Sequence, residues 1–136
     1  MKLKIGYQEL IQAAMAEIET LPMEKAQKVM GDPNSVFIDI RDLRELEREG
    51  LIPNAFHAPR GMLEFWVDPD SPYYKPIFGE GKKLILYCAS AWRSALAAQT
   101  LQSMGVPNVC HLEGGFNAWK KAKLPMVEKA SKPHSS

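Results

Sequence analysis

The chain has 136 residues, of which 46% are hydrophobic, as is typical of one domain with a packed core. Lysine and arginine total 17 against 16 acidic residues, and the formal net charge of +1 gives no electrostatic argument for nucleic acid or a membrane as the main partner. No apolar run approaches the roughly 18 residues of a membrane span, and residues 1–6 lack the apolar core of a signal peptide. We therefore expect a cytoplasmic protein.

Apolar residues at helical spacing predict an amphipathic helix within residues 1–19. These residues are Tyr7, Leu10, Ile11, Ala14, Met15 and Ile18. Such a stripe packs either on its own domain or on a second copy of the chain. A homodimer through this helix is therefore one expectation.

Short apolar runs alternate with helical segments from residue 20 to residue 128. The strands are predicted at 36–40, 55–58, 84–88 and 109–112, and the helices at 23–30, 41–49, 61–67, 92–104 and 116–122. This alternation predicts an α/β domain whose parallel sheet is flanked by helices on both faces. Residues 129–136 are expected to form a flexible polar tail.

A long loop rich in proline and glycine is predicted at residues 68–81. The aromatic residues in and before it are Phe65, Trp66, Tyr73, Tyr74 and Phe78. They form either a lid over a site, since long loops are often functional, or a hydrophobic cluster under the loop.

The chain has two cysteines, Cys88 and Cys110, and neither lies in a Cys-x-x-Cys or Cys/His pair. We therefore expect no metal site. Cys110 and His111 lie within a predicted strand, where the first is typical of a small buried hydrophobe. His111 is expected to be a half-buried strand residue, not a general base.

Cys88 ends a predicted strand and is followed by a short loop and a helix. Sites in parallel sheets form beyond the carboxyl ends of the strands. Loop N–H groups and a helix N-terminus stabilise anions, including a thiolate. We therefore predict a nucleophilic Cys88 in an anion-binding loop. The predicted loop residues are Ala89, Ser90, Ala91, Trp92 and Arg93.

Charged residues near other strand ends are predicted to support this site. Arg93 either attracts a substrate anion or forms an ion pair with Asp39 or a neighbouring acid that fixes the loop. Asp39 favours a structural role as an acceptor of loop N–H groups. Arg41 and Arg60 either steer an anionic donor or are solvated surface charges.

Four segments resemble the rhodanese family of sulfurtransferases. They are Ile38–Asp42, Gly50–Ala55, Cys88–Ser94 and Leu112–Trp119. The resemblance implies a single-domain rhodanese-like fold with an extra N-terminal helix. It also implies a sulfurtransferase that moves sulfane sulfur from thiosulfate, a persulfide or a polysulfide to a thiophilic acceptor through a Cys88 persulfide. The implied partners are a small sulfur-containing anion and a thiol or protein sulfur acceptor, with no cofactor.

Departures from the family pattern keep other functions open. Ala91 stands where many members have glycine, and Ala89 places no basic side chain next to the cysteine, so we expect weak affinity for thiosulfate. Phosphatases and arsenate reductases of related architecture place five residues between cysteine and arginine, whereas four separate Cys88 from Arg93. A Cys-dependent phosphatase or arsenate reductase is the less favoured rival. A non-catalytic sulfur-carrier or protein-docking module is the other alternative.

Overall fold

Five parallel strands form one sheet in the order β1-β5-β4-β2-β3 in the computed structural model, which describes residues 1–130. The strands are β1 (Glu19–Leu21), β2 (Ser35–Asp39), β3 (Phe56–His57), β4 (Lys83–Tyr87) and β5 (Val109–Leu112). The helices are α1 (Tyr7–Glu17), α2 (Met23–Lys28), α3 (Leu43–Glu49), α4 (Leu63–Val67), α5 (Trp92–Ser103) and α6 (Gly115–Lys121). Two 3₁₀ turns are η1 (Arg60–Met62) and η2 (Pro76–Gly79).

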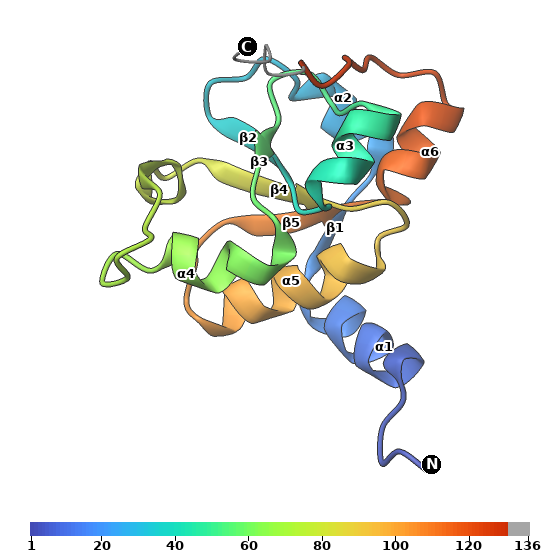
Figure 1. The fold of residues 1–136 in the computed structure, drawn as a ribbon, viewed down its shortest axis with the longest axis vertical. Coiled ribbons are helices and arrows are strands. Elements are labelled where there is room, and N and C mark those ends of the chain that lie inside the picture. Colours follow the sequence, from blue (N-terminus) through green and yellow to red (C-terminus); the bar gives the residue numbers. More distant parts are fainter. Residues whose placement is uncertain (131–136) are drawn as a thin grey trace, which may run out of the picture.

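Helices cover both faces of the sheet, as the sequence predicts. Figure 1 shows α2, α3 and α6 on one side and α1, α4 and α5 on the other. In β4, Leu84 and Leu86 pack in the core beside α5, while Ile85 and Tyr87 pack in the core beside α6. Because both faces are covered, the inner strands β2 and β4 are almost continuously apolar.

The edge strand β1 is the element that the sequence does not predict. It has three residues between two helices, too few to show a period of two. Residue 19 was expected in the N-terminal helix, but α1 ends at Glu17. Pairing with β5 places Thr20 opposite His111. The side chains of these two residues form a hydrogen bond near Cys88.

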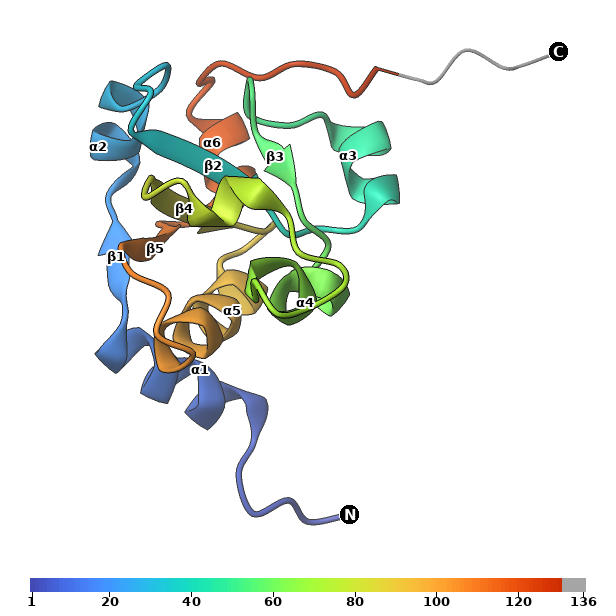
Figure 2. The same ribbon diagram turned by 90° about the vertical axis from the view of Figure 1, so that its left-hand side faces the viewer.

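Helix α1 packs against α5 of the same chain (Figure 2). Ala14 and Ile18 belong to the main core, and the Gln102 side-chain amide donates to the Glu17 carbonyl oxygen at 2.9 Å. Part of the amphipathic stripe therefore packs in the core of its own domain. The exposed apolar members of the stripe are Tyr7, Leu10 and Met15.

The segment after α6 pairs with the segment between α3 and β3. Leu51 and Val127 exchange two backbone hydrogen bonds of 2.9 Å, and the Trp119 indole N–H donates to the Pro125 carbonyl oxygen at 2.7 Å. The predicted tail at residues 129–136 lies mostly outside the described residues. Within residues 1–130, no helix is long and apolar enough to cross a membrane.

Candidate functional site

Cys88 directly follows the carboxyl end of β4, near the centre of the sheet. Its side chain is 1% exposed. The loop after it closes back on the sulfur, because the Ser94 backbone N–H in the first turn of α5 donates to Cys88 Sγ at 3.4 Å. The thiol therefore lies at the N-terminus of a 12-residue helix, where the helix dipole favours a negative charge.

The loop between Cys88 and Ser94 offers a row of backbone donors. Within residues 1–130, no protein acceptor is assigned to the backbone N–H groups of residues 89–93. Backbone N–H groups of this kind bind anions at helix N-termini. Residues 89–93 therefore have the donors that the sequence predicts for an anion-binding loop.

Two backbone hydrogen bonds from the start of α6 hold the loop. The Phe116 N–H donates to the Cys88 carbonyl oxygen at 2.8 Å, and the Asn117 N–H donates to the Ala89 carbonyl oxygen at 3.0 Å. A Cβ at Gly115 would lie 2.6 Å from the Ala89 oxygen and 2.8 Å from the Cys88 oxygen. Glycine at this position lets the two backbones approach, and this explains the glycine in the segment that resembles the rhodanese pattern.

Ala91 adopts the left-handed backbone conformation, with φ of +70°. The sequence shows alanine here where many family members have glycine. A residue with a Cβ is strained at such a φ value, whereas glycine is not. The turn into α5 therefore stores local strain beside Cys88.

Arg93 forms a bidentate ion pair with Glu45 of α3. Its two terminal nitrogens donate to the two carboxylate oxygens at 2.8 Å each. Glu45 also accepts the Asp42 N–H at 2.9 Å, and the Arg93 hydrogen bonds are the main reason that the pKa of Glu45 falls to about 2. Arg93 thus fixes the loop through a neighbouring acid, but this acid is Glu45 and not Asp39.

Asp39 and Arg41 form a buried pair that is separate from the loop. The Arg41 guanidinium donates to the two Asp39 oxygens at 3.0 and 2.7 Å and to the Gly50 carbonyl oxygen at 2.7 Å. It also lies 4.3 Å from the Phe116 ring centroid. Arg41 is 1% exposed, so it neither steers a donor nor acts as a surface charge, the two roles expected from the sequence. Its pair with Asp39 instead fixes the turn after β2. Asp39 has the expected structural role: it accepts the Arg41 backbone N–H at 3.1 Å in the turn after β2, and its other bonds come from the Arg41 guanidinium and not from residues 89–93.

Rim side chains reach solvent at Ser90 and Trp92, which are exposed, and at Arg60, which is half-buried. Trp92 is 53% exposed, and its ring centroid lies 5.1 Å from that of Tyr7 in α1. Arg60 is paired with Glu64 at 2.7 Å, with both side chains partly exposed. The sequence predicts Trp92 and Arg60 at the rim but gives no signal for Tyr7, whose approach depends on how α1 packs.

A buried polar contact links Cys88 to strands β5 and β1 of the sheet. Ser94 Oγ lies 3.7 Å from Cys88 Sγ and 2.9 Å from His111 Nδ1. His111 Nε2 lies 3.0 Å from Thr20 Oγ1. His111 is fully buried, so the expectation of a half-buried strand residue is wrong. The sequence cannot show this contact because it depends on the register of β1 and β5.

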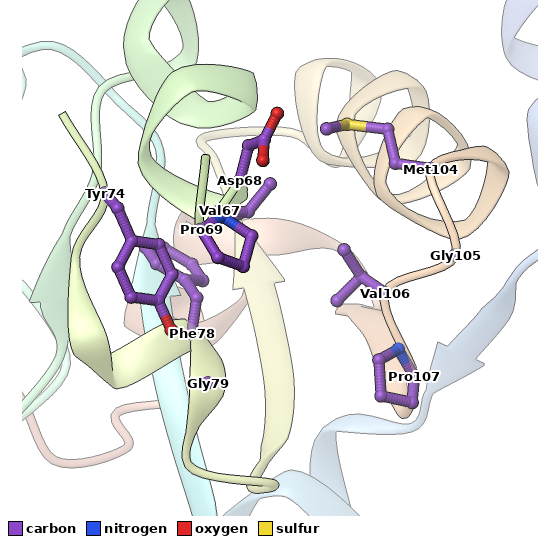
Figure 3. A pocket seen from close by; sticks show the side chains of 10 residues that line it. All are labelled: Val67, Asp68, Pro69, Tyr74, Phe78, Gly79, Met104, Gly105, Val106 and Pro107. Carbon is purple, nitrogen blue, oxygen red and sulfur yellow. The ribbon is translucent and has the colours of Figure 1, made fainter. Parts of the chain in front are cut away.

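The aromatic residues of the long loop do not cover Cys88. Trp66 and Phe78 pack edge-on against Phe56 in the main core, with ring centroids 6.1 and 6.0 Å apart. Tyr74 and Phe78 line a pocket with Val106 (Figure 3). This pocket adjoins the segments that enter β4 and β5, at the opposite edge of the sheet from Cys88. Trp66 and Phe78 therefore belong to a hydrophobic cluster and not to a lid over Cys88, while Phe65 and Tyr73 are exposed.

The family is established by comparison with known proteins. Residues 22–122 match the rhodanese-like domain family. The chain therefore belongs to this family, as its four motifs indicate. Within residues 1–130, no group of three His, Cys, Asp or Glu side chains is placed to hold a metal ion.

Three relatives show the range of names attached to this fold. An uncharacterised protein of Synechocystis sp. is 35% identical over 85% of this chain, which spans 60% of that protein's length. A structure from Rhodopseudomonas palustris, a protein of unknown function named as a possible tyrosine phosphatase, is 49% identical with a TM-score of 0.90 and covers 93% of this chain and 98% of its own. The polysulfide-sulfur transferase homodimer of Wolinella succinogenes is 28% identical with a TM-score of 0.68, covering 96% of this chain and 93% of its own.

Proposed function

We propose that this chain is a sulfurtransferase that carries sulfane sulfur as a persulfide on Cys88. The observation that carries the proposal is the closed loop, in which the Ser94 N–H reaches the sulfur and the N–H groups of residues 89–93 have no protein acceptor among the described residues. Such a loop stabilises a negatively charged sulfur. In the proposed reaction the sulfur is an anion both as the Cys88 thiolate and as the Cys88 persulfide. The related Wolinella succinogenes protein is named for sulfur transfer.

The proposed reaction has two displacement steps. The Cys88 thiolate attacks the outer sulfur of thiosulfate, the S–S bond of the donor breaks, and sulfite leaves with the electron pair. The persulfide anion that results is held by the loop amides. An acceptor such as cyanide or a thiolate then attacks the outer sulfur, and the Cys88 thiolate is released as the leaving group. No net oxidation, metal or organic cofactor is needed.

The charges around the loop favour a persulfide or polysulfide donor over thiosulfate. The only arginine of the loop has its two terminal nitrogens bound to Glu45, and residue 89 is alanine. Glu45 neutralises part of the Arg93 charge, so a doubly charged donor gains less from this arginine than from an unpaired one. The exposed Trp92 and Tyr7 rings offer apolar area at the rim, which suits a thiol or protein acceptor more than a small inorganic ion.

Phosphate hydrolysis is the second candidate, because a relative with 49% identity is named as a possible tyrosine phosphatase. Two features of this chain oppose it. Only four residues separate Cys88 from Arg93, which leaves a smaller ring of amides than the five-residue loops of phosphatases. The Arg93 guanidinium, which would bind the phosphoryl oxygens, is paired with Glu45.

The deciding experiment measures both reactions on the same purified chain. We expect Cys88-dependent transfer of sulfur from thiosulfate or polysulfide to cyanide or a thiol, and negligible hydrolysis of an aryl phosphate. Robust phosphate release that disappears in Cys88→Ser, without sulfur transfer, would replace this proposal by a phosphatase. Sulfur loading without turnover, restored by a protein acceptor, would favour the carrier alternative. Cytoplasmic location and dimerisation through α1 stay predictions.

A further inference from the structure

The buried contact behind Cys88 has one consistent set of donors and acceptors when the sulfur is a thiolate. A thiolate can only accept, so the Ser94 hydroxyl must donate to Cys88 Sγ across 3.7 Å. Ser94 Oγ then accepts from His111 Nδ1 at 2.9 Å. The Nδ1 atom of His111 therefore carries the ring proton in this state.

The far side of the ring follows from the same reasoning. Burial lowers the pKa of His111 below its ordinary value, so the ring is neutral at pH 7 and has one N–H. With the proton on Nδ1, the bare Nε2 accepts from the Thr20 hydroxyl at 3.0 Å. Every donor in the series Thr20, His111, Ser94 then points toward the sulfur.

We propose that His111 is a positioning residue that holds the Ser94 hydroxyl toward the sulfur of Cys88, with Thr20 fixing the ring from its other side. This inference rests on the proposed function, in which Cys88 alternates between thiolate and persulfide. Full burial of Ser94 and His111 keeps water from replacing these hydrogen bonds, and an unpaired buried polar group is costly.

The protonated thiol requires the opposite direction. The thiol then donates to Ser94 Oγ, and the nearest acceptor for the Ser94 hydroxyl is His111 Nδ1. The ring proton must then lie on Nε2, which donates to Thr20 Oγ1. The tautomer of His111 therefore reports the ionisation state of Cys88.

Nitrogen NMR of the unmodified chain with ¹⁵N-labelled histidine tests this directly. We expect His111 to carry its proton on Nε2 at a pH where iodoacetamide alkylates Cys88 slowly, and on Nδ1 at a pH where alkylation has reached its plateau. His111→Asn identifies the His111 signals by their loss. A His111 ring with the same tautomer at both pH values would overturn the inference.

Variants test the effect on the nucleophile. We expect His111→Leu to slow alkylation of Cys88 at pH 7 by about fivefold to tenfold, the effect of one lost hydrogen bond between neutral groups, here His111 Nδ1 and Ser94 Oγ, and to move the pH profile upward. His111→Asn, whose side-chain N–H lies close to the position of Nδ1, should restore most of the rate. Thr20→Val should have a smaller effect in the same direction.

Thr100→Val is the matched control, because Thr100 lies on α5 like Ser94 but its hydroxyl donates to the Leu96 carbonyl oxygen at 3.0 Å, away from Cys88. An unchanged pH profile in a folded His111→Leu variant would contradict the positioning role. If that variant does not fold, the tautomer measurement decides alone. Neither readout requires sulfur transfer, so a chain that transfers no sulfur but shows both effects would refute the proposed function and leave this inference standing.

Discussion

At the scale of single residues, the two thiols differ in their surroundings. Cys88 Sγ receives a backbone N–H at the start of a helix, whereas burial raises the pKa of Cys110 to about 12. At neutral pH the Cys110 thiol is therefore protonated and shielded. The burial of Cys110 follows from its side of the strand. Cys110 packs in the core on the α6 side, while the neighbouring His111 points to the opposite face and contacts α5.

We expect Cys88→Ala to abolish sulfur transfer and Cys110→Ala to keep most of it in a folded protein. Removing the Cys110 sulfur leaves a small cavity that costs about 1 kcal/mol of stability, without touching the loop. Steady-state assays together with thermal melting of both variants test this. Equal loss of activity in two folded variants would contradict the assignment of the nucleophile.

The ion pair between Arg93 and Glu45 predicts a pH dependence of stability. The pKa of Glu45 falls from 4.5 to about 2 on folding, so its contribution is fully present above about pH 4.5 and is lost as the pH falls toward 2. Arg93 is partly solvent-exposed, which limits the contribution to about 1–2 kcal/mol. Glu45→Gln should therefore destabilise the protein by this amount at pH 7, and by less at pH 3.

Urea unfolding at several pH values measures this difference. Glu47→Gln is the control, since Glu47 is exposed on the same helix and should change stability by less than about 0.5 kcal/mol. A Glu45→Gln effect that stays constant between pH 7 and pH 3 would mean that the carboxylate charge does not stabilise the loop.

At the scale of elements, the turn between β4 and α5 carries the backbone strain of the site. Ala91→Gly should relieve the strain of its positive φ value and, after the entropy cost of glycine, raise stability by about 0.5–1 kcal/mol. The expected rise in melting temperature is about 2–4 °C. Ala13→Gly, in the middle of α1, should instead lower stability by about 1 kcal/mol. Equal losses in the two variants would contradict the strain.

The junction of the loop with α6 depends on a close backbone approach. Gly115→Ala places a Cβ against the carbonyl oxygens of Cys88 and Ala89 at a positive φ value, which should cost about 2–4 kcal/mol and slow Cys88 alkylation. Gly61→Ala is the control, because a Cβ there meets no atom within 4 Å. Urea unfolding and alkylation rates measure both effects. A Gly115→Ala variant as stable and reactive as the control would show that the loop is not held by α6.

The elements that the sequence predicts best are those with a continuous local signal. The apolar runs of β2, β4 and β5 and the helical segments of α3 and α5 are each encoded within neighbouring residues, and the observed bounds differ from the predicted ones by at most two residues. The strand β1 has three residues and no pattern of its own. It exists because β5 offers an edge to pair with.

The site divides in the same way. Cys88 and residues 89–93 are consecutive in the chain, so the proposed anion-binding loop can be predicted from the sequence alone. The contacts of Arg93 with Glu45 and of Ser94 with His111 join residues 48 and 17 positions apart. Such pairs are set by helix packing and strand register, which a single sequence does not reveal.

At the scale of the whole molecule, the two edges of the sheet have different roles. The carboxyl edge holds Cys88, the exposed Trp92 and the loop N–H groups that have no protein acceptor within residues 1–130. The opposite edge carries a pocket lined in part by Tyr74 and Phe78, which belongs to the packing of the long loop. The parallel topology thus gathers the proposed chemistry at one edge, as is general for open α/β sheets.

The measurement that tests the central claim most directly is a peptide mass spectrum of the chain after incubation with thiosulfate or polysulfide. A persulfide adds one sulfur atom, about 32 daltons. We predict this addition on the peptide that contains Cys88, its removal by cyanide with release of thiocyanate, and no addition on the peptide that contains Cys110. A folded chain that gains no sulfur on Cys88 from either donor, or gains it equally on Cys110, would contradict the account.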